Sequence, residues 1–262
     1  MARADTRPST LSAGARLRFR ALGDLWAHRS HWQLPLPRAL MRRERDTQLS
    51  ELMPGILVVA LMAGILLFVM LPSSLGDSYP AALATLWPIW VVQAAPMAAA
   101  QILAMQRAPT LALELTHRHA GGEFAALTHL QASPAAWPCV SLIVAHAWVT
   151  AAASVLFVTL TLAFGFGFAF ILDVGDLRQS IDMVFALVSP LDWGRSFIAA
   201  LLLGGLCSLA SILSAWPGTQ SASASVDAHR LGLRTMMISS VVCVAGALAL
   251  NWVLNLLHYF YL

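Results

Sequence analysis

The basic side chains of this sequence are all arginines: it contains 16 of them and no lysine. Two kinds of chemistry are therefore excluded. No lysine can form a Schiff base with a carbonyl substrate, and the phosphate-binding loop G-x-x-x-x-G-K-[ST] cannot be built. If this protein uses nucleotide energy, we expect a separate chain to hydrolyse the nucleotide.

The histidines and cysteines form no metal-binding or redox motif. His117 and His119 are two residues apart and would not share a helix face, which argues against a metal site. Cys139, Cys207 and Cys243 lie far apart in apolar stretches without C-x-x-C spacing. We therefore expect no metal ion or other cofactor, and we interpret the cysteines as small buried apolar side chains.

Charged side chains gather in the segment 107–137, where Glu114 lies between Arg107 and Arg118. A carboxylate close to a membrane is costly unless it is paired, so either arginine could form an ion pair with Glu114. The alternative is an exposed acid in a loop. Both arginines are also expected to meet the cytoplasmic surface or lipid headgroups.

A short amphipathic helix is predicted at about 122–131, directly after a break at a pair of glycines. Glu123 stands at its start, and one of its faces is apolar, formed by Phe124, Leu127 and Leu130. A short helix held against a membrane between two spans is suited to docking a cytoplasmic partner. A plain connector is the alternative.

Two other segments contain charges that could meet partners. Arg230 and Arg234 are four residues apart and would share a helix face at the cytoplasmic surface or headgroups. Anchoring by positive charge alone would also explain them. Between residues 173 and 195, three acids could contact a periplasmic partner or only water: Asp173, Asp176 and Asp182.

The composition indicates the environment in which these side chains act. Hydrophobic residues make up 58% of the 262 residues, charged residues only 11%, and the mean hydropathy is +0.71. Soluble domains contain about 25% charged residues, so an ordinary soluble enzyme is excluded. A disordered chain is excluded as well, because such chains are rich in charge. We predict an all-α polytopic membrane protein.

Five segments are long and apolar enough to span a membrane, which takes about 20 residues. They are 52–71, 85–106, 139–165, 196–216 and 235–257. The third begins a longer uncharged stretch, in which Gly165 and Gly167 are predicted to break the helix. The predicted organisation is an N-terminal region, 1–51, followed by a five-helix membrane domain, 52–262.

The placement of arginine predicts the orientation. Ten of the 16 arginines precede residue 46, so we expect the N-terminus to lie in the cytoplasm. The region 1–51 lacks the pattern of a signal peptide. Its Phe, Leu and Trp residues at helical spacing, interrupted by Pro35 and Pro37, predict an amphipathic interfacial helix. A solvated basic tail is the alternative.

Several short elements follow one another in a fixed order. The first set is Gln93, Ala94, Ala95 and Pro96, then Arg107, then Leu113 and Glu114, then Glu123, then Ser133 and Pro134. The second set is Arg230, Arg234, Thr235, Ser239 and Ser240. These elements resemble those of the MlaE (YrbE) family of ABC-transporter permeases, which move lipids between the membranes of diderm bacteria. The resemblance covers about residues 30–258.

The resemblance implies a transport subunit of the bacterial inner membrane that performs no covalent chemistry itself. Two permease chains would form a dimer around a phospholipid cavity, and a periplasmic MCE-domain protein would contact the outer acids. The short helix predicted at about 122–131 would be the coupling helix, which cytoplasmic ABC ATPase subunits contact. The residues implied in this contact, on the helix and just before it, are Glu114, Glu123, Phe124, Leu127 and Leu130. No nucleic acid is implied as a partner.

Two other interpretations stay open. The family's Ala-Gly-Arg-Ala-Gly-Ser-Ala glycines are replaced in the stretch from Met105 to Thr110, which favours pairing with a second, different permease or a purely structural role. A membrane enzyme is less favoured. The sequence contains no H-E-x-x-H or G-x-S-x-G motif, and the predicted spans contain no acidic residue.

Overall fold

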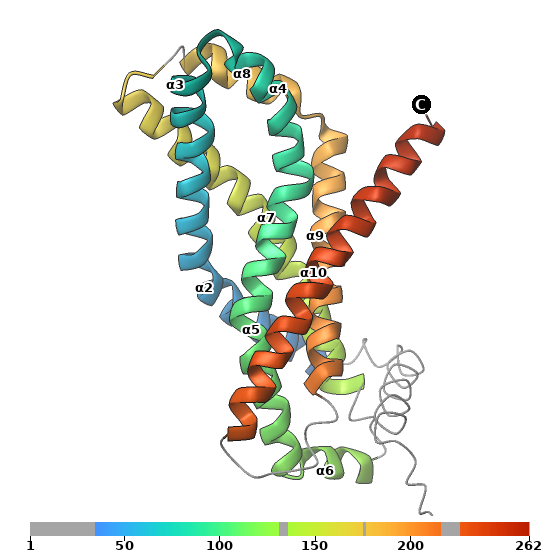
Figure 1. Cartoon of the computed structure of the whole chain (residues 1–262). Coiled ribbons are helices and arrows are strands. Elements are labelled where there is room, and N and C mark those ends of the chain that lie inside the picture. Colours follow the sequence, from blue (N-terminus) through green and yellow to red (C-terminus); the bar gives the residue numbers. More distant parts are fainter. Residues whose placement is uncertain (1–34, 131–135, 175–176, 216–225, 262) are drawn as a thin grey trace, which may run out of the picture.

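The computed structural model describes residues 35–130, 136–174, 177–215 and 226–261 (Figure 1). Within these ranges the chain is almost entirely helical and has no strand, which confirms the all-α prediction. The amphipathic segment predicted before residue 35 lies outside the described residues. The two ends of the bundle are named below after α6 (Glu123–His129), at the bottom of Figure 1, and α8 (Leu177–Leu187), at its top.

The first helix, α2 (Pro35–Ile65), runs without interruption from the N-terminal region into the first predicted span. No helix boundary falls at residue 51, where we expected the interfacial helix to give way to the span. Pro54 lies inside α2 and cannot donate to the helix ladder, and the helix bends in its lower part (Figure 1). Its buried face repeats every four residues: Gln48, Leu52, Ile56 and Ala60.

The chain reverses direction at the α8 end, so that α2 and the elements after it form a helical hairpin (Figure 1). In order, the elements after α2 are η2 (Leu66–Met70), α3 (Leu71–Leu75), η3 (Gly76–Ser78), α4 (Tyr79–Ile89), η4 (Trp90–Ala94) and α5 (Ala95–Ala120). Gly76 occupies the turn with a φ of 50°, a conformation that favours glycine. The descending arm from α4 to α5 extends beyond both ends of the predicted span 85–106.

The next helix, α7 (Ala136–Ile171), is unbroken, so the predicted break at Gly165 and Gly167 is wrong. Gly165 instead marks the point where α7 crosses α2. A Cβ atom on Gly64 would lie 2.6 Å from the Thr161 carbonyl oxygen and 2.7 Å from the Gly165 nitrogen. The two glycines therefore allow the backbones to touch, as small residues do where membrane helices cross.

Three helices complete the bundle: α8, α9 (Pro190–Ala215) and α10 (Val226–Tyr261) (Figure 1). A reciprocal cap starts α9. The Ser189 backbone N–H and hydroxyl donate to the Asp192 carboxylate at 3.0 and 2.8 Å, and the Asp192 N–H donates to the Ser189 hydroxyl at 3.3 Å. This cap begins the helix before the predicted start at residue 196.

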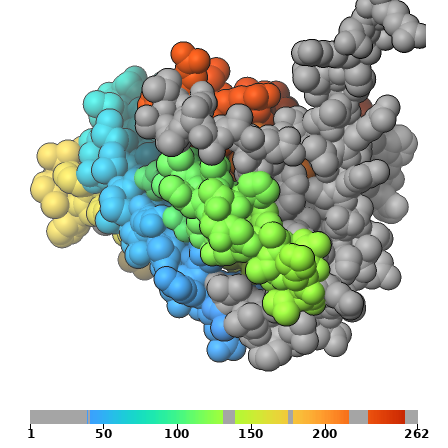
Figure 2. All heavy atoms as spheres, turned by 90° about the horizontal axis from the view of Figure 1, so that it is seen from below, coloured from blue at the N-terminus to red at the C-terminus, as the bar shows by residue number. Residues whose placement is uncertain are grey.

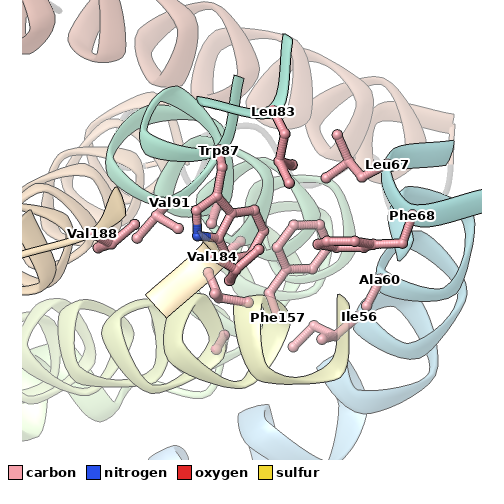
Figure 3. Close-up of a cluster of buried hydrophobic side chains, with 14 of the residues drawn as sticks. Ile56, Ala60, Leu67, Phe68, Leu83, Trp87, Val91, Phe157, Val184 and Val188 are labelled. Carbon is pink, nitrogen blue, oxygen red and sulfur yellow. The ribbon is translucent and has the colours of Figure 1, made fainter. Parts of the chain in front are cut away.

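Aromatic side chains fill the core nearer the α8 end (Figure 3). Phe68 of η2 and Trp87 of α4 meet edge to face, with ring centroids 5.8 Å apart. Trp90 of η4 stacks on Phe157 of α7 at 5.7 Å. Val184 of α8 belongs to the same cluster, so this core joins the hairpin, α7 and α8 into one unit.

Small side chains line the contacts that α9 makes with its neighbours. The Ser196 hydroxyl donates to a backbone carbonyl of η4 at 2.8 Å, and the Ser211 and Ser239 hydroxyls lie 2.6 Å apart between α9 and α10. A Cβ atom on Gly204 would lie 2.7 Å from the Thr150 Cβ of α7. These contacts are of the kind that hold helices together in lipid.

Four helical segments of the described chain are long and apolar enough to cross a membrane: Met41–Ala120, Cys139–Ile171, Pro190–Ala215 and His229–Val253. Their outward faces carry large apolar side chains, such as Met62, Val241 and Trp252, which are 65–67% exposed. Both observations are compatible with a membrane protein.

Candidate functional site

The α6 end of the bundle contains most of the charged residues that the sequence singles out. Here α5 continues past the predicted end of its span to Ala120, and the chain turns at Gly121 and Gly122. Gly122 has a φ of 77°, where a side chain would be strained. α6 follows directly, so the predicted glycine break and the short helix after it are confirmed.

The apolar face of α6 is turned into the bundle. Phe124 is 9% exposed and packs on a cluster from α5, α7 and α9, formed by Leu111, Ala112, Leu115, Cys139, Leu142, Ile212 and Ala215. The Phe124 ring also meets the His119 ring edge to face at 5.7 Å, and Leu127 packs on the same cluster. Phe124 and Leu127 therefore anchor α6 to its own chain, and their contact with an ATPase stays a prediction.

The opposite side of α6 forms part of the surface. Glu123 and His129 are exposed, and Leu130, just after the helix, is 74% exposed. Viewed from below, Figure 2 shows α6 in yellow-green at this face, with α5 in green lying beside α2 in blue. The surface available to a partner is thus formed by Glu123, His129 and Leu130, and it is called the α6 outer face below.

Replacing Phe124 with alanine should detach α6 without unfolding the long helices. A buried Phe→Ala substitution costs about 3–5 kcal/mol, and a helix of seven residues is too short to persist alone. We expect faster hydrogen exchange at the amides of residues 121–130 and unchanged exchange in α7 and α9. Leu130→Ala, at the exposed position, is the matched control. Unchanged protection of α6 in Phe124→Ala would contradict the anchoring.

Glu114 forms its ion pair within α5. Its Oε1 lies 2.5 Å from Nη2 of Arg118, one helical turn along, and both side chains are about one-third exposed or less. The predicted ion pair is confirmed with Arg118, and Arg107 is directed elsewhere. Because the pair is within one helix and partly exposed, it contributes only about 0.3–0.5 kcal/mol to stability.

Arg107 joins α5 to α2. Its Nη2 lies 2.9 Å from Oε2 of Glu44, and its Nη1 lies 3.4 Å from Oε2 of Glu51. The Arg107 and Glu44 side chains are only 13% and 16% exposed, whereas Glu51 is 48% exposed. These three residues are called the Arg107 cluster below. The Arg107 guanidinium pairs with acids of its own chain, so the expected contact of Arg107 with headgroups is replaced by an interhelical ion pair.

A buried glutamine extends the Arg107 cluster towards α7. The Gln48 Nε2 lies 3.4 Å from Oε2 of Glu44 and 3.2 Å from Nδ1 of His146, and Gln48 and His146 are almost fully buried. The His146 Nδ1 also lies 2.8 Å from the carbonyl oxygen of Leu142. A continuous polar network therefore connects α5, α2 and α7. The sequence analysis did not identify Glu44 and Gln48 as part of a site. The spacing of four residues between Gln48 and the apolar Leu52 could have indicated that Gln48 lies on the buried face of the helix.

The remaining charged candidates lie on the surface. Arg230 and Arg234 are exposed on α10 and form no ion pair with any described residue, so their contact with headgroups stays a prediction. Asp173 follows α7 with a φ of 51°, and Asp182 is exposed on α8. Asp176 lies outside the described residues.

An apolar pocket of about 230 Å³ lies between the descending arm, α9 and α10. Gln93 of η4 donates to the Asn251 side-chain oxygen of α10 at 2.8 Å, and both residues line the pocket. The other lining residues are apolar, among them Met97, Leu203 and Leu248. The pocket therefore offers space for an apolar group beside one polar pair. It lies at the π-helical segment η4, and π-helical segments are frequent at functional sites.

The described residues offer no site of obvious covalent or metal chemistry. No three His, Cys, Asp or Glu side chains among them lie close enough together to hold a metal ion. Cys139, Cys207 and Cys243 are buried and form no disulfide, which confirms their interpretation as buried side chains.

A scan against models of known protein families finds no match, and a search of curated proteins finds no relative.

Proposed function

We propose that this chain is the membrane-spanning permease of an ATP-driven lipid transporter in the bacterial inner membrane. A separate cytoplasmic ATPase would supply the energy, and an MCE-domain protein would take up lipid on the periplasmic side. The single observation that supports this best is α6, a short helix clamped to the ends of three long apolar helices with one face left at the surface.

The clamping matters because a docking helix must transmit force. The inner face of α6 packs on α5, α7 and α9 through Phe124, and α5 is tied to α2 through the Arg107 cluster. A partner that moved α6 would therefore act on four long helices at once. A plain connector would not need this anchoring.

We further propose that the segment Met41–Ala120 crosses the membrane twice, with its reversal at Gly76 on the periplasmic side. With the three other candidate spans, this gives five crossings. The α6 end is then cytoplasmic, in agreement with the ten arginines before residue 46 and with Arg230 and Arg234 at the same end.

The lipid would enter between the long helices. The pocket at Gln93 and Asn251 supplies an apolar space with one polar pair. The exposed apolar stripe of α10, with Met237, Val241 and Leu248, supplies a surface for lipid or for a second permease chain. An apolar cavity moves lipid without covalent chemistry, so ATP hydrolysis is left to the partner.

A pair of matched substitutions tests the docking role. Leu130→Asp on the α6 outer face should reduce the ATPase recovered with the chain from mild detergent by about tenfold or more, because interface core positions tolerate charge poorly. Leu191→Asp changes a similarly exposed leucine (64%) at the α8 end and should leave recovery unchanged. Equal recovery with both variants would contradict docking through this face.

A further inference from the structure

A second and larger pocket opens at the α8 end of the bundle, with a volume of about 550 Å³. Its lining residues come from the hairpin turn, the end of α7 and α8. Its apolar walls include Phe68 and Phe166, whose ring centroids are 4.6 Å apart, and Met183. A volume of this size is in the range that holds small ligands or part of a lipid.

The polar lining of this pocket contains a single acidic residue. Asp77 stands in η3 at the hairpin turn, is exposed, and forms no ion pair with any described residue. Ser73 and Ser180 add hydroxyl groups, and no basic side chain is among the lining residues. The pocket therefore combines apolar walls with one negative charge, which suits an amphiphile whose polar group is a cation.

The shape of this pocket depends on specific features of the fold. The π-helical segment η2 contributes Phe68 to the wall, and such segments are frequent at functional sites. Tyr79 of α4 is 9% exposed and lines the pocket opposite α8, which contributes Ser180. Gly76 lines the pocket with a φ of 50° and has no atom within 4 Å of where a Cβ would be, so the turn leaves the space beside Asp77 open.

We propose that this pocket binds an ethanolamine-headed phospholipid, with the ammonium group at Asp77 and the upper acyl chain against Phe68 and Phe166. A primary ammonium donates charge-assisted hydrogen bonds to a carboxylate. An anionic headgroup would be repelled by Asp77, and a quaternary ammonium has no N–H to donate and is recognised by aromatic cages instead. The inference rests on the proposed membrane location, but not on ATP-driven transport.

Native mass spectrometry of the full chain in a neutral detergent tests this site. The probe is an equimolar mixture of ethanolamine-headed and glycerol-headed phospholipids with identical acyl chains. We expect the ethanolamine lipid to be retained with about a three- to tenfold preference, the value of one partly exposed charged hydrogen bond. Equal retention of the two lipids, or retention of neither, would overturn the proposal.

Two variants and one competitor complete the test. Asp77→Asn should abolish the preference, whereas Asp182→Asn, which removes an exposed acid on α8 outside the pocket, should keep it. A preference that survives Asp77→Asn would reject the assignment. Excess free ethanolamine should fail to displace the lipid, because it lacks the apolar part; full displacement would show a site for the amine alone. No arm involves an ATPase, so failure here leaves the proposed transport function standing.

Discussion

Arg107→Gln should destabilise the bundle by about 2 kcal/mol or more. Breaking a buried ion pair by removing one partner costs about 3–5 kcal/mol, because the remaining charge stays buried. Here Glu44, 16% exposed, would lose its cation at 2.9 Å. Because both side chains of this pair are partly exposed, the expected loss can fall below that range, to about 2 kcal/mol. Reversible denaturation in mixed detergent micelles measures the change in free energy of unfolding.

The double variant separates the ion pair from other effects of the substitution. Glu44→Gln combined with Arg107→Gln leaves only Glu51 without its partner, and Glu51 is 48% exposed to solvent. The double variant should therefore be more stable than the sum of the single losses predicts, by about 1–3 kcal/mol. Arg118→Gln, which breaks the more exposed pair with Glu114, is the matched control and should cost less than about 0.5 kcal/mol. Additive losses at Glu44 and Arg107 would mean that the pair does not lock α2 to α5.

Gly165→Leu should be at least as damaging, because it forces α2 and α7 apart. A Cβ atom at this position would already lie 3.0 Å from the Gly64 carbonyl oxygen and would overlap the Phe68 ring. Overpacking of this kind costs about 1–3 kcal/mol and more where backbone must move. The same denaturation experiment should show an early unfolding midpoint.

Gly167 provides the control for this substitution, two residues further along the same helix. Nothing lies within 4 Å of a Cβ built there, and the residue is exposed. Gly167→Leu should therefore leave the unfolding midpoint almost unchanged, or raise it slightly because leucine favours helix over glycine. Equal effects of the two substitutions would show that helix propensity, rather than the crossing at Gly64, decides the outcome.

The helical architecture could be predicted from the sequence because hydropathy and length are local properties. The glycine break before α6 was found in the same way, since Gly121 and Gly122 interrupt an otherwise continuous pattern. Gly165 was misjudged for the opposite reason. A glycine in a helix weakens it locally, but here the loss is offset by close packing against Gly64, which only the three-dimensional contact reveals.

The candidate site was predicted less well than the fold. The amphipathic pattern of α6 correctly identified Phe124 and Leu127 as one apolar face, but the pattern cannot say whether that face meets a partner or the chain's own core. Arg107 and Glu44 are 63 residues apart, so no local spacing indicates their ion pair. Interhelical polar contacts depend on which helices become neighbours, and hydropathy carries no information about that choice.

Purification of the intact assembly from its native membrane in mild detergent, followed by identification of every co-purifying chain, tests the proposed transport role most directly. We expect an ATPase with Walker motifs together with an MCE-domain protein. If a second, different permease is recovered, the assembly contains a heterodimer. If the assembly contains two permease chains and both are this protein, it contains a homodimer. An intact assembly recovered without any ATPase would contradict the proposal that this chain is the permease of an ATP-driven lipid transporter.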